Sequence, residues 1–449
     1  MLGDSTVLTA ELAEELVTPA YLYDLAEVRG NHDRLVNALP AGTGLYYSVK
    51  ANPHPAVLAQ LRDSGARAEV CSPGELAAVL AAGWPAGEVL YGGPGKRDSD
   101  VDSALALGVR TFSVDSPEAL DQLDRLAAGR GVTCQALVRI NDDRPVPGQG
   151  LAMTGVPSQF GADAAWVVAE PRRFAGRPHV TVVGLHLYMG TNLVRMDDLV
   201  TQFARSARTA LRVTQALTPY GMDLRVLDLG GGFGAPFATA GTAVSLDGLA
   251  PRLAELFDET FPAWRDGRPR LDFESGRYLV GTAGTLLVRV LDAKTSHGRR
   301  VVVLDSGINH LGGMSGLRRL PPLRPALVRR PGARPDIDDD VTETLVAGPL
   351  CTPLDTWAPA APLPPLRPGD LLAVPNVGAY GLYASLVAFL GHPMPTELVV
   401  DSEKSPGSVL HASQLTLARA QRPGTHSRKE TRHERSLRPG RHAAPEVPR

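Results

Sequence analysis

The chain has 449 residues, which is enough to bury a large core in two or three domains. Its formal net charge is −2 at pH 7, so its charge gives no general reason to bind nucleic acid or an anionic membrane. The sequence has no uninterrupted apolar run of about 18 residues, so no membrane-spanning segment is expected.

Cysteine usage favours a reducing compartment. Cys71, Cys134 and Cys351 are too few and too far apart for a disulfide framework or a zinc site. The N-terminal residues, Met1 to Glu15, include acidic residues where a signal peptide would carry positive charge. We therefore expect a cytoplasmic protein without a metal site and without nucleic-acid or membrane partners.

Between Tyr21 and Gly281, short apolar runs of strand character alternate with longer amphipathic stretches, which is typical of repeated βα units. Eight strands over roughly 250 residues match a (β/α)8 barrel of the TIM type, and a doubly wound open sheet is the alternative. The expected strands are Gly44–Val49, Arg67–Cys71, Glu88–Tyr91, Arg110–Val114, Gln135–Ile140, Val180–Leu187, Leu224–Leu229 and Arg270–Glu274. The expected helices include Pro55–Asp63, Pro73–Ala82, Pro117–Ala128 and Met196–Leu217, several of which begin with proline.

Polar and glycine residues recur at the ends of these strands. In a barrel of this kind the active site forms at the carboxyl ends of the strands, although strand ends are also rich in turn residues that need no functional explanation. The residues at this phase are Lys50, Ser72, Gly92, Gly93, Asp115, Arg139, Asn141, His186, Gly230–Gly234, Glu274 and Arg277.

Lys50 is the first residue of this set, in a chain with only five lysines against 41 arginines. An amine at the end of a buried strand is desolvated, which lowers its pKa and lets it condense with an aldehyde, as lysines do with pyridoxal phosphate. The alternative is a lysine whose stem packs on the surface while its amine reaches water.

The later strands carry groups that suit the same cofactor. Glycines in Gly230–Gly234 let backbone N–H groups approach a phosphate, although a nucleotide site or a tight turn would use the same residues. Glu274 closes a buried strand and needs a cation, which a protonated pyridine nitrogen or Arg277 could supply. His186 is expected to point into the barrel, where it could lie flat against an aromatic ring or be a structural residue.

After Gly281 the helical pattern fades and a second, all-β domain is expected. Cys351 lies in a loop flanked by glycine and proline, with Thr352 and Asp355 close by. This setting suits a positioned thiol that acts as an acid, although free cysteine is commonly a small buried apolar residue. The expected strands are Val288–Leu291, Arg300–Leu304, Glu343–Val346 and Asp370–Val374, and Tyr380 follows in Gly378-Ala379-Tyr380.

These patterns divide the chain into three parts. Residues 22–281 are expected to form the barrel, and residues 1–21 with 282–404 the β-rich domain. Residues 405–449 are expected to be a basic tail. From Arg419 onward the chain has nine Arg or Lys against three Asp or Glu and almost no large apolar residues, so this tail is expected to be disordered.

Together these residues resemble the fold-type III pyridoxal-phosphate decarboxylases. That family contains diaminopimelate, ornithine and arginine decarboxylases and shares its barrel with alanine racemase. The resemblance runs from Thr18 to about Val400. The motifs that carry it are Tyr47-Ser48-Val49-Lys50-Ala51-Asn52, Cys71-Ser72-Pro73-Gly74-Glu75-Leu76, Val138-Arg139-Ile140-Asn141, Ser158-Gln159-Phe160-Gly161, the His186 strand, Gly230–Gly234, Glu274-Ser275-Gly276-Arg277, Gly348–Asp355 and Gly378-Ala379-Tyr380.

The resemblance implies pyridoxal phosphate as the cofactor and the release of CO2 from an α-amino acid to leave an amine. It implies that Lys50 binds the cofactor covalently, that His186 stacks on its ring and that Glu274 binds the pyridine nitrogen. The resemblance also places Gly232, Gly234, Arg277 and Tyr380 at or beside the phosphate. It implies Arg139 as a further residue of the cofactor site.

In this family the cysteine loop reaches across a dimer interface into the neighbouring barrel. The resemblance therefore implies that Cys351 protonates the α-carbon after CO2 leaves, with Asp355 and Thr352 near the distal end of the substrate. The unit that it implies is a head-to-tail homodimer with two composite sites.

Two departures from the family pattern bear on the substrate. Diaminopimelate decarboxylases usually carry a glutamate directly after the cysteine, placed for the distal amino group, whereas this chain has Thr352. The segment Ser158-Gln159-Phe160-Gly161 has glutamine where lysine is usual. Asp305–Arg318 and Gly381–Pro395 look more like a carrier-linked or specialised-pathway subgroup. The substrate is expected to be a free diaminopimelate- or ornithine-like amino acid or an aminoacyl group tethered to an acyl carrier protein.

Two other functions share parts of this pattern. An amino-acid racemase on the same barrel would use a tyrosine from the partner subunit as its second base, whereas Cys351 in this motif suits decarboxylation. A non-catalytic pyridoxal-phosphate-binding protein would be a single barrel, and the β-rich region with Cys351 and Tyr380 counts against it.

Overall fold

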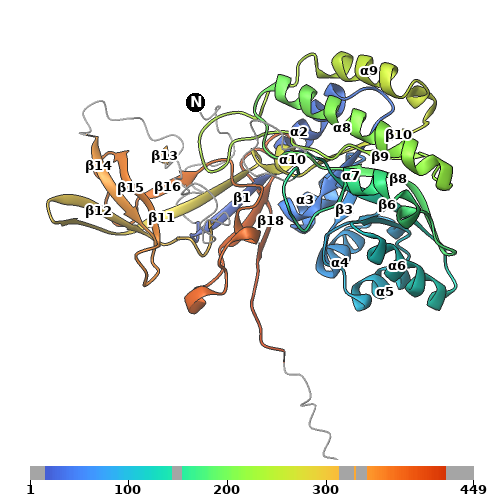
Figure 1. Ribbon diagram of the computed structural model, residues 1–449. Helices are drawn as coiled ribbons and strands as arrows, with labels where there is room; N and C mark the ends of the chain where they lie inside the picture. The colour runs from blue at the N-terminus through green and yellow to red at the C-terminus, as the bar shows by residue number, and fades with distance from the viewer. Residues whose placement is uncertain (1–15, 144–153, 313–327, 330–340, 421–449) are drawn as a thin grey trace, which may run out of the picture. The chain divides into compact units, whose positions relative to one another are not determined.

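The computed structural model describes residues 16–143, 154–312, 328–329 and 341–420 (Figure 1). The chain divides into one unit that ends at Leu415 and a short one that begins at Thr416. The sheets, helices and site described below all lie in the first unit. Within the described ranges, no helix is both long and apolar enough to cross a membrane.

Eight parallel strands close into a barrel. They follow one another around it in chain order, and the last strand, β10, pairs with the first, β2, through Asp272 and Gly44. This pairing confirms the predicted (β/α)8 barrel and excludes the open sheet. The strands are β2 (Gly44–Ser48), β3 (Arg67–Val70), β4 (Leu90–Tyr91), β5 (Thr111–Val114), β6 (Cys134–Asn141), β8 (Val180–Leu187), β9 (Val226–Asp228) and β10 (Arg270–Ser275), while the short β7 (Ala162–Asp163) pairs only with β6.

Helices connect the barrel strands and lie around them (Figure 1). Two of them show why the sequence starts a helix where it does: Ser72 and Ser116 each accept a backbone N–H from the first turn, and a proline follows each serine. The helices are α2 (Leu25–Ala38), α3 (Pro55–Asp63), α4 (Pro73–Ala81), α5 (Asp98–Ala106), α6 (Pro117–Arg130), α7 (Ala164–Ala169), α8 (Met196–Leu217), α9 (Leu249–Thr260) and α10 (Arg277–Val280).

A second, nine-stranded sheet confirms the predicted all-β domain. Its order is β15-β14-β12-β11-β1-β17-β18, and β16 pairs with both β11 and β13. The strands are β1 (Ala20–Asp24), β11 (Gly284–Ser296), β12 (Arg299–Leu304), β13 (Val328–Arg329), β14 (Thr342–Ala347), β15 (Thr356–Leu363), β16 (Leu371–Val374), β17 (Thr396–Val400) and β18 (Val409–Gln414).

The edges of this sheet differ from the sequence prediction. Strand β15 contains Pro359 and Pro362, which argue against a strand in sequence but are tolerated at the end of a sheet, where β15 lies. Strand β18 pairs with β17 although it lies after residue 405, so the predicted tail starts too early. The predicted boundary at residues 21 and 22 falls inside β1. The rest of the predicted tail, residues 421–449, lies outside the described residues.

The sheet and the barrel meet at the segment that carries Lys50. The Tyr380 backbone N–H donates to the Ala51 carbonyl at 2.8 Å, and the Asn52 amide donates to the Gly378 carbonyl at 2.9 Å. A side chain at Gly378 would collide with the Val280 carbonyl, so only glycine allows this approach. The Gly378–Tyr380 loop of the β domain is thereby fixed beside the turn after β2.

Candidate active site

A narrow pocket opens at the carboxyl ends of the barrel strands. Five residues predicted from the sequence line it: Lys50, Gly232, Glu274, Arg277 and Tyr380. It thus contains most of the predicted cofactor residues of one chain. The other lining residues are Ser48, Tyr188, Thr191, Asn192, Phe233, Ser275 and Gly276.

Lys50 lies on a short turn after β2, and its Nζ lies 3.1 Å from Oε2 of the buried Glu69. Burial acts to lower the pKa of Lys50, but the acidic groups Cys71, Glu69 and Glu274 outweigh burial and hold that pKa well above its ordinary value. The prediction of a lowered pKa is therefore wrong. Its physical reason is the carboxylate of Glu69, which faces the amine, and the side chain itself is 42% exposed.

His186 on β8 and Glu274 on β10 face each other inside the barrel. His186 Nε2 and Glu274 Oε1 lie 3.2 Å apart, and each side chain is only 2% exposed. His186 Nδ1 lies 2.8 Å from the Ser113 hydroxyl. Burial acts to raise the pKa of Glu274, but His186, Lys50 and Arg139 lower it to about 2. Glu274 is therefore a buried anion at neutral pH.

Arg277 and Ser275 provide donors on another side of the pocket. Arg277 Nε and Ser275 Oγ are buried and, among the described residues, have no hydrogen-bond partner. The Arg277 guanidinium lies over the Tyr380 ring, 5.0 Å from its centroid. Buried donors that lack protein partners usually bind a ligand or water, so this pair fits an anion such as a phosphate.

The glycine run contributes in two ways. Gly232 lines the pocket with φ at +108°, a backbone conformation that other residues rarely adopt. A side chain at Gly234 would collide with the Leu193 carbonyl. Gly234 therefore allows the loop to pack closely, and it is not one of the described residues that line the pocket.

Several strand-end residues have structural partners. Arg139 is paired in register with His186, and its guanidinium lies 4.6 Å from the centroid of the Phe160 ring. Ser72 caps helix α4. Asp115 accepts the Gly161 N–H at 2.7 Å. Asn141 donates to Asp163 at 3.0 Å. These residues shape the rim of the barrel, and turn chemistry explains their positions.

The Cys351 loop joins β14 to β15 at the edge of the β sheet. Cys351 is exposed, and the Thr352 hydroxyl accepts the Leu354 N–H at 3.3 Å. The described residues that line the pocket include neither Cys351 nor Thr352. One chain therefore does not bring this loop to its own Lys50.

Asp355 was predicted to lie near the distal end of the substrate. Its side chain is buried, and one carboxylate oxygen accepts the Ile308 N–H at 2.8 Å while the other accepts the Leu350 N–H at 2.9 Å. One oxygen thus holds the loop that carries Cys351, and the other holds the segment after β12. Asp355 therefore organises this loop, and its contact with a substrate stays a prediction.

Three further residues that were not predicted as site residues matter here. Glu69 and Asp228 are buried carboxylates on barrel strands, and a charge inside an apolar strand was the signal for each. Lys96 is a second lysine near the barrel mouth; its side chain is buried, and its Nζ donates to the Ser113 carbonyl at 2.9 Å. Burial lowers the pKa of Lys96. Lys50 is therefore not the only lysine at the barrel mouth.

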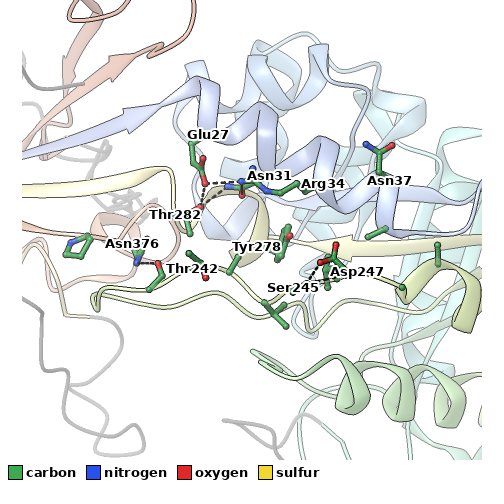
Figure 2. Close-up of a pocket in the computed structure, with 18 of the residues that line it drawn as sticks. Glu27, Asn31, Arg34, Asn37, Thr242, Ser245, Asp247, Tyr278, Thr282 and Asn376 are labelled. Atoms are coloured by element: carbon green, nitrogen blue, oxygen red, sulfur yellow. Dashed lines mark hydrogen bonds and ion pairs between the residues drawn. The ribbon is translucent and has the colours of Figure 1, made fainter. Parts of the chain in front are cut away.

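A larger hollow of about 860 Å³ lies beside helix α2, and Figure 2 shows the polar side chains that line it. These side chains contact one another: Arg34 donates to Glu27 and Asn31, and the Thr282 hydroxyl donates to Glu27. The predicted catalytic and cofactor residues do not line this hollow.

Comparison with known proteins identifies the family. Residues 25–281, more than half of the chain, match the family described as pyridoxal-dependent decarboxylase, pyridoxal binding domain. The chain belongs to this family. The match covers the whole barrel, including Lys50, His186, Glu274 and Arg277.

Individual relatives extend the match over most of the chain. The chain is 32% identical over 403 residues to the L-glutamyl-[BtrI acyl-carrier protein] decarboxylase of Niallia circulans, covering 88% of this chain and 91% of that protein. It is 31% identical over 406 residues to the diaminopimelate decarboxylase of Methanothermobacter thermautotrophicus, covering 88% and 89%. The crystal structure of Helicobacter pylori diaminopimelate decarboxylase complexed with L-lysine matches with a TM-score of 0.75 and 25% identity, covering 88% of this chain and 94% of that one.

These matches confirm the predicted family, enzyme class and cofactor. The protein is a pyridoxal-phosphate-dependent amino-acid decarboxylase. Its residues fit the cofactor: anionic Glu274 suits a protonated ring nitrogen, and the unpartnered Arg277 and Ser275 atoms suit a phosphate. The family comparisons therefore support decarboxylation over racemisation or non-catalytic binding of pyridoxal phosphate.

Proposed function

We propose that this decarboxylase acts on an α-amino acid whose distal end is neutral, as in an aminoacyl group joined to an acyl carrier protein. The observation that carries this proposal is the Cys351 loop. Thr352, Pro353 and Leu354 follow the cysteine, and Leu354 is 77% exposed. Asp355, the one carboxylate in the loop Gly348–Asp355, is buried and occupied by backbone N–H groups. The loop therefore offers no anion to a distal ammonium group.

The relatives support the same substrate class without deciding it. The Niallia circulans relative is named for an L-glutamyl group on an acyl carrier protein, whereas the Methanothermobacter relative is named for diaminopimelate. A glutamyl group bound to a carrier through its side chain has a neutral thioester at the distal end. A free diamino acid has a cation there, which a buried or neutral surface disfavours.

Pyridoxal phosphate supplies an aldehyde that captures amines and a ring that withdraws electrons from the α-carbon as CO2 leaves. In our proposal Lys50 holds it covalently, with Glu69 beside the amine at 3.1 Å. Arg277, Ser275, Tyr380 and the backbone around Gly232 hold the phosphate.

Glu274 and His186 serve the ring. The Glu274 anion accepts a hydrogen bond from the ring nitrogen and stabilises a proton there, which makes the ring a better electron acceptor. His186 lies beside Glu274, fixed by the Ser113 hydroxyl at 2.8 Å. Arg139 adds positive charge on the neighbouring strand, at the residue paired with His186.

We further propose a homodimer in which Cys351 of the partner subunit gives its thiol proton to the α-carbon after CO2 departs. The position of Cys351, exposed and outside the pocket of its own chain, supports this arrangement. The thiolate regains a proton from water. A cytoplasmic location, where the free cysteines Cys71, Cys134 and Cys351 stay reduced, suits this chemistry.

The substrate proposal is tested by measuring CO2 release from a panel of α-amino acids. The panel contains free glutamate, ornithine, diaminopimelate and a glutamyl-loaded acyl carrier protein. We expect kcat/KM to be highest for the carrier-bound glutamyl group. A higher kcat/KM for free diaminopimelate or ornithine would contradict the proposal.

A variant at the loop makes the test sharper. Thr352→Glu adds a carboxylate directly after Cys351, where an anion could pair with a distal ammonium. We expect this variant to gain diaminopimelate decarboxylation and to lose activity on the carrier-bound group. Thr352→Gln, which has the same shape without the charge, is the matched control and should not show that gain.

A further inference from the structure

Asp228 is a buried carboxylate to which the proposed mechanism gives no role. It closes strand β9 and is 0% exposed. In the barrel register it is paired with His186 on β8 and with Asp272 on β10. It therefore lies directly beside the residues that serve the cofactor ring.

Its two oxygens are in different environments. Asp228 Oδ1 accepts the Gly230 N–H at 2.9 Å. Oδ2 is buried and has no hydrogen-bond partner among the described residues. One ring nitrogen of His186 and one carboxylate oxygen each of Asp228 and Glu274 all lie within 4.8 Å of one another. Two carboxylates thus share a small buried space.

Two carboxylates this close in a buried site cannot both ionise without sufficient positive charge, so one keeps a proton. The available cations favour ionisation of Glu274, whose Oε1 lies 3.2 Å from His186. Arg270 and Arg67 are already bound to Asp272, Arg270 through a 2.7 Å contact and Arg67 at 3.3 Å. Asp228 is left with a single backbone N–H.

The surrounding charges agree with this assignment. Burial raises the pKa of Asp228 well above its ordinary value, and Glu274 and Asp272 raise it further. The pKa of Glu274, in contrast, is lowered to about 2 against the effect of burial by His186 and Lys50. The ionisable groups that act electrostatically on Asp228 are Glu274, Asp272, Glu69, Arg270 and Tyr46, and His186 lies close to it.

We propose that Asp228 carries a proton at neutral pH and donates its Oδ2–H toward the Glu274 and His186 pair. Asp228 is then a positioning residue that acts through Glu274. A neutral donor stabilises the Glu274 anion, whereas an ionised Asp228 would repel it. A stabilised Glu274 anion is also a weaker base. The proton between Glu274 and the cofactor's ring nitrogen therefore stays on the nitrogen, a consequence that rests on the function proposed for Glu274.

Infrared spectroscopy of the full-length holoenzyme, labelled with carboxyl-13C aspartate, tests the protonation state directly. At neutral pH we expect the carbonyl band of a protonated aspartic acid that shifts in D2O. The band should disappear in Asp228→Asn. It should persist in Asp272→Asn and in Asp401→Asn, because both of those carboxylates form ion pairs with arginines. The same band is expected after the cofactor is removed, so this readout does not depend on activity.

A second readout separates a neutral donor from an ionised group. Asn supplies a neutral N–H in place of the acid, so Asp228→Asn should keep kcat/KM within about threefold of wild type. Asp228→Leu lacks a donor, and it should lower kcat/KM roughly tenfold more than Asp228→Asn does.

Absence of the protonated-acid band from the wild-type enzyme, or its survival in Asp228→Asn, would overturn the proposal. Loss of activity in Asp228→Asn as severe as in Asp228→Leu would do the same. A different result, near-normal turnover in Glu274→Gln with the Asp228 band intact, would instead count against the proposed role of Glu274.

Discussion

The charge of Lys50 depends on its neighbours more than on burial. Glu69 lies 3.1 Å from its amine, and Cys71 and Glu274 also act to raise the pKa of Lys50. A raised pKa keeps this amine protonated at neutral pH. The Lys50 amine must therefore lose a proton before it can attack an aldehyde. Glu69, at 3.1 Å, is well placed to accept that proton.

Borohydride reduction of the holoenzyme should fix the cofactor to Lys50. We expect mass spectrometry to find the pyridoxyl group on the peptide that contains Lys50, and no label there in Lys50→Ala. Lys96 is the internal rival, because its side chain is buried and burial lowers its pKa. Recovery of the label on Lys96 or on the exposed Lys294 would contradict the assignment.

Glu274→Gln removes the buried negative charge while keeping the shape of the side chain. A neutral amide cannot hold a proton on the ring nitrogen, so turnover should fall by roughly 3–4 kcal/mol of transition-state stabilisation, or several hundredfold. The cofactor should stay bound, as its visible absorbance can show. Turnover close to wild type would mean that Glu274 is a structural partner of His186.

At the scale of elements, α2 is tied to the end of β17 by an ion pair. Arg29 donates two hydrogen bonds to Asp401, at 2.8 and 3.1 Å, and Arg29 lowers the pKa of Asp401 to about 2. The Asp401 side chain is only 4% exposed. The ion pair therefore joins α2, the first helix of the barrel, to the β sheet.

Asp401→Asn should lower the free energy of unfolding by about 2 kcal/mol at pH 7, from the difference between folded and ordinary pKa values. Because the folded pKa is depressed, this contribution is present above an ordinary aspartate pKa and is lost as pH falls towards about 2. Urea unfolding at several pH values should show the difference between wild type and variant shrinking below about pH 4. Asp33→Asn, at a side chain 71% exposed on the same helix, is the matched control and should change little. An equal loss at pH 7 and pH 3 would contradict this account.

Elements with strong local signals could be predicted from sequence. Helices α3 and α8 have the predicted bounds because Pro55 and a long amphipathic pattern mark them. Strands β15, β17 and β18 were not predicted: β15 and β18 are edge strands that each pair with the preceding strand, and β17 pairs with the distant β1. Pro359 and Pro362 are acceptable in β15 only at a sheet edge, and sequence does not say which strand lies there.

The same limit applied to the site. Lys50, Glu274 and Arg277 were found because they follow strands that end at one face of the barrel. The pairing of Glu69 with Lys50 and the burial of Asp355 depend on side-chain packing between elements. A run of letters shows that a carboxylate is present, but whether it is free depends on which N–H groups surround it.

At the scale of the whole molecule, the central claim is a site shared between two subunits. Each site would take Lys50, His186 and Glu274 from one barrel and Cys351 from the partner subunit's β sheet. A matched control distinguishes this from a site within one chain: exchange of wild type with the double variant Lys50→Ala, Cys351→Ala. In a shared-site dimer the mixed species has no intact site, whereas in a single-chain site it keeps one.

The most direct measurement mixes inactive Lys50→Ala with inactive Cys351→Ala and follows CO2 release after subunit exchange has been confirmed by native mass spectrometry. Half of randomly exchanged dimers are mixed and each would hold one intact site of two, so about a quarter of wild-type activity should return. No recovery of activity in a sample with confirmed mixed dimers would contradict the shared site and leave Cys351 without a catalytic role.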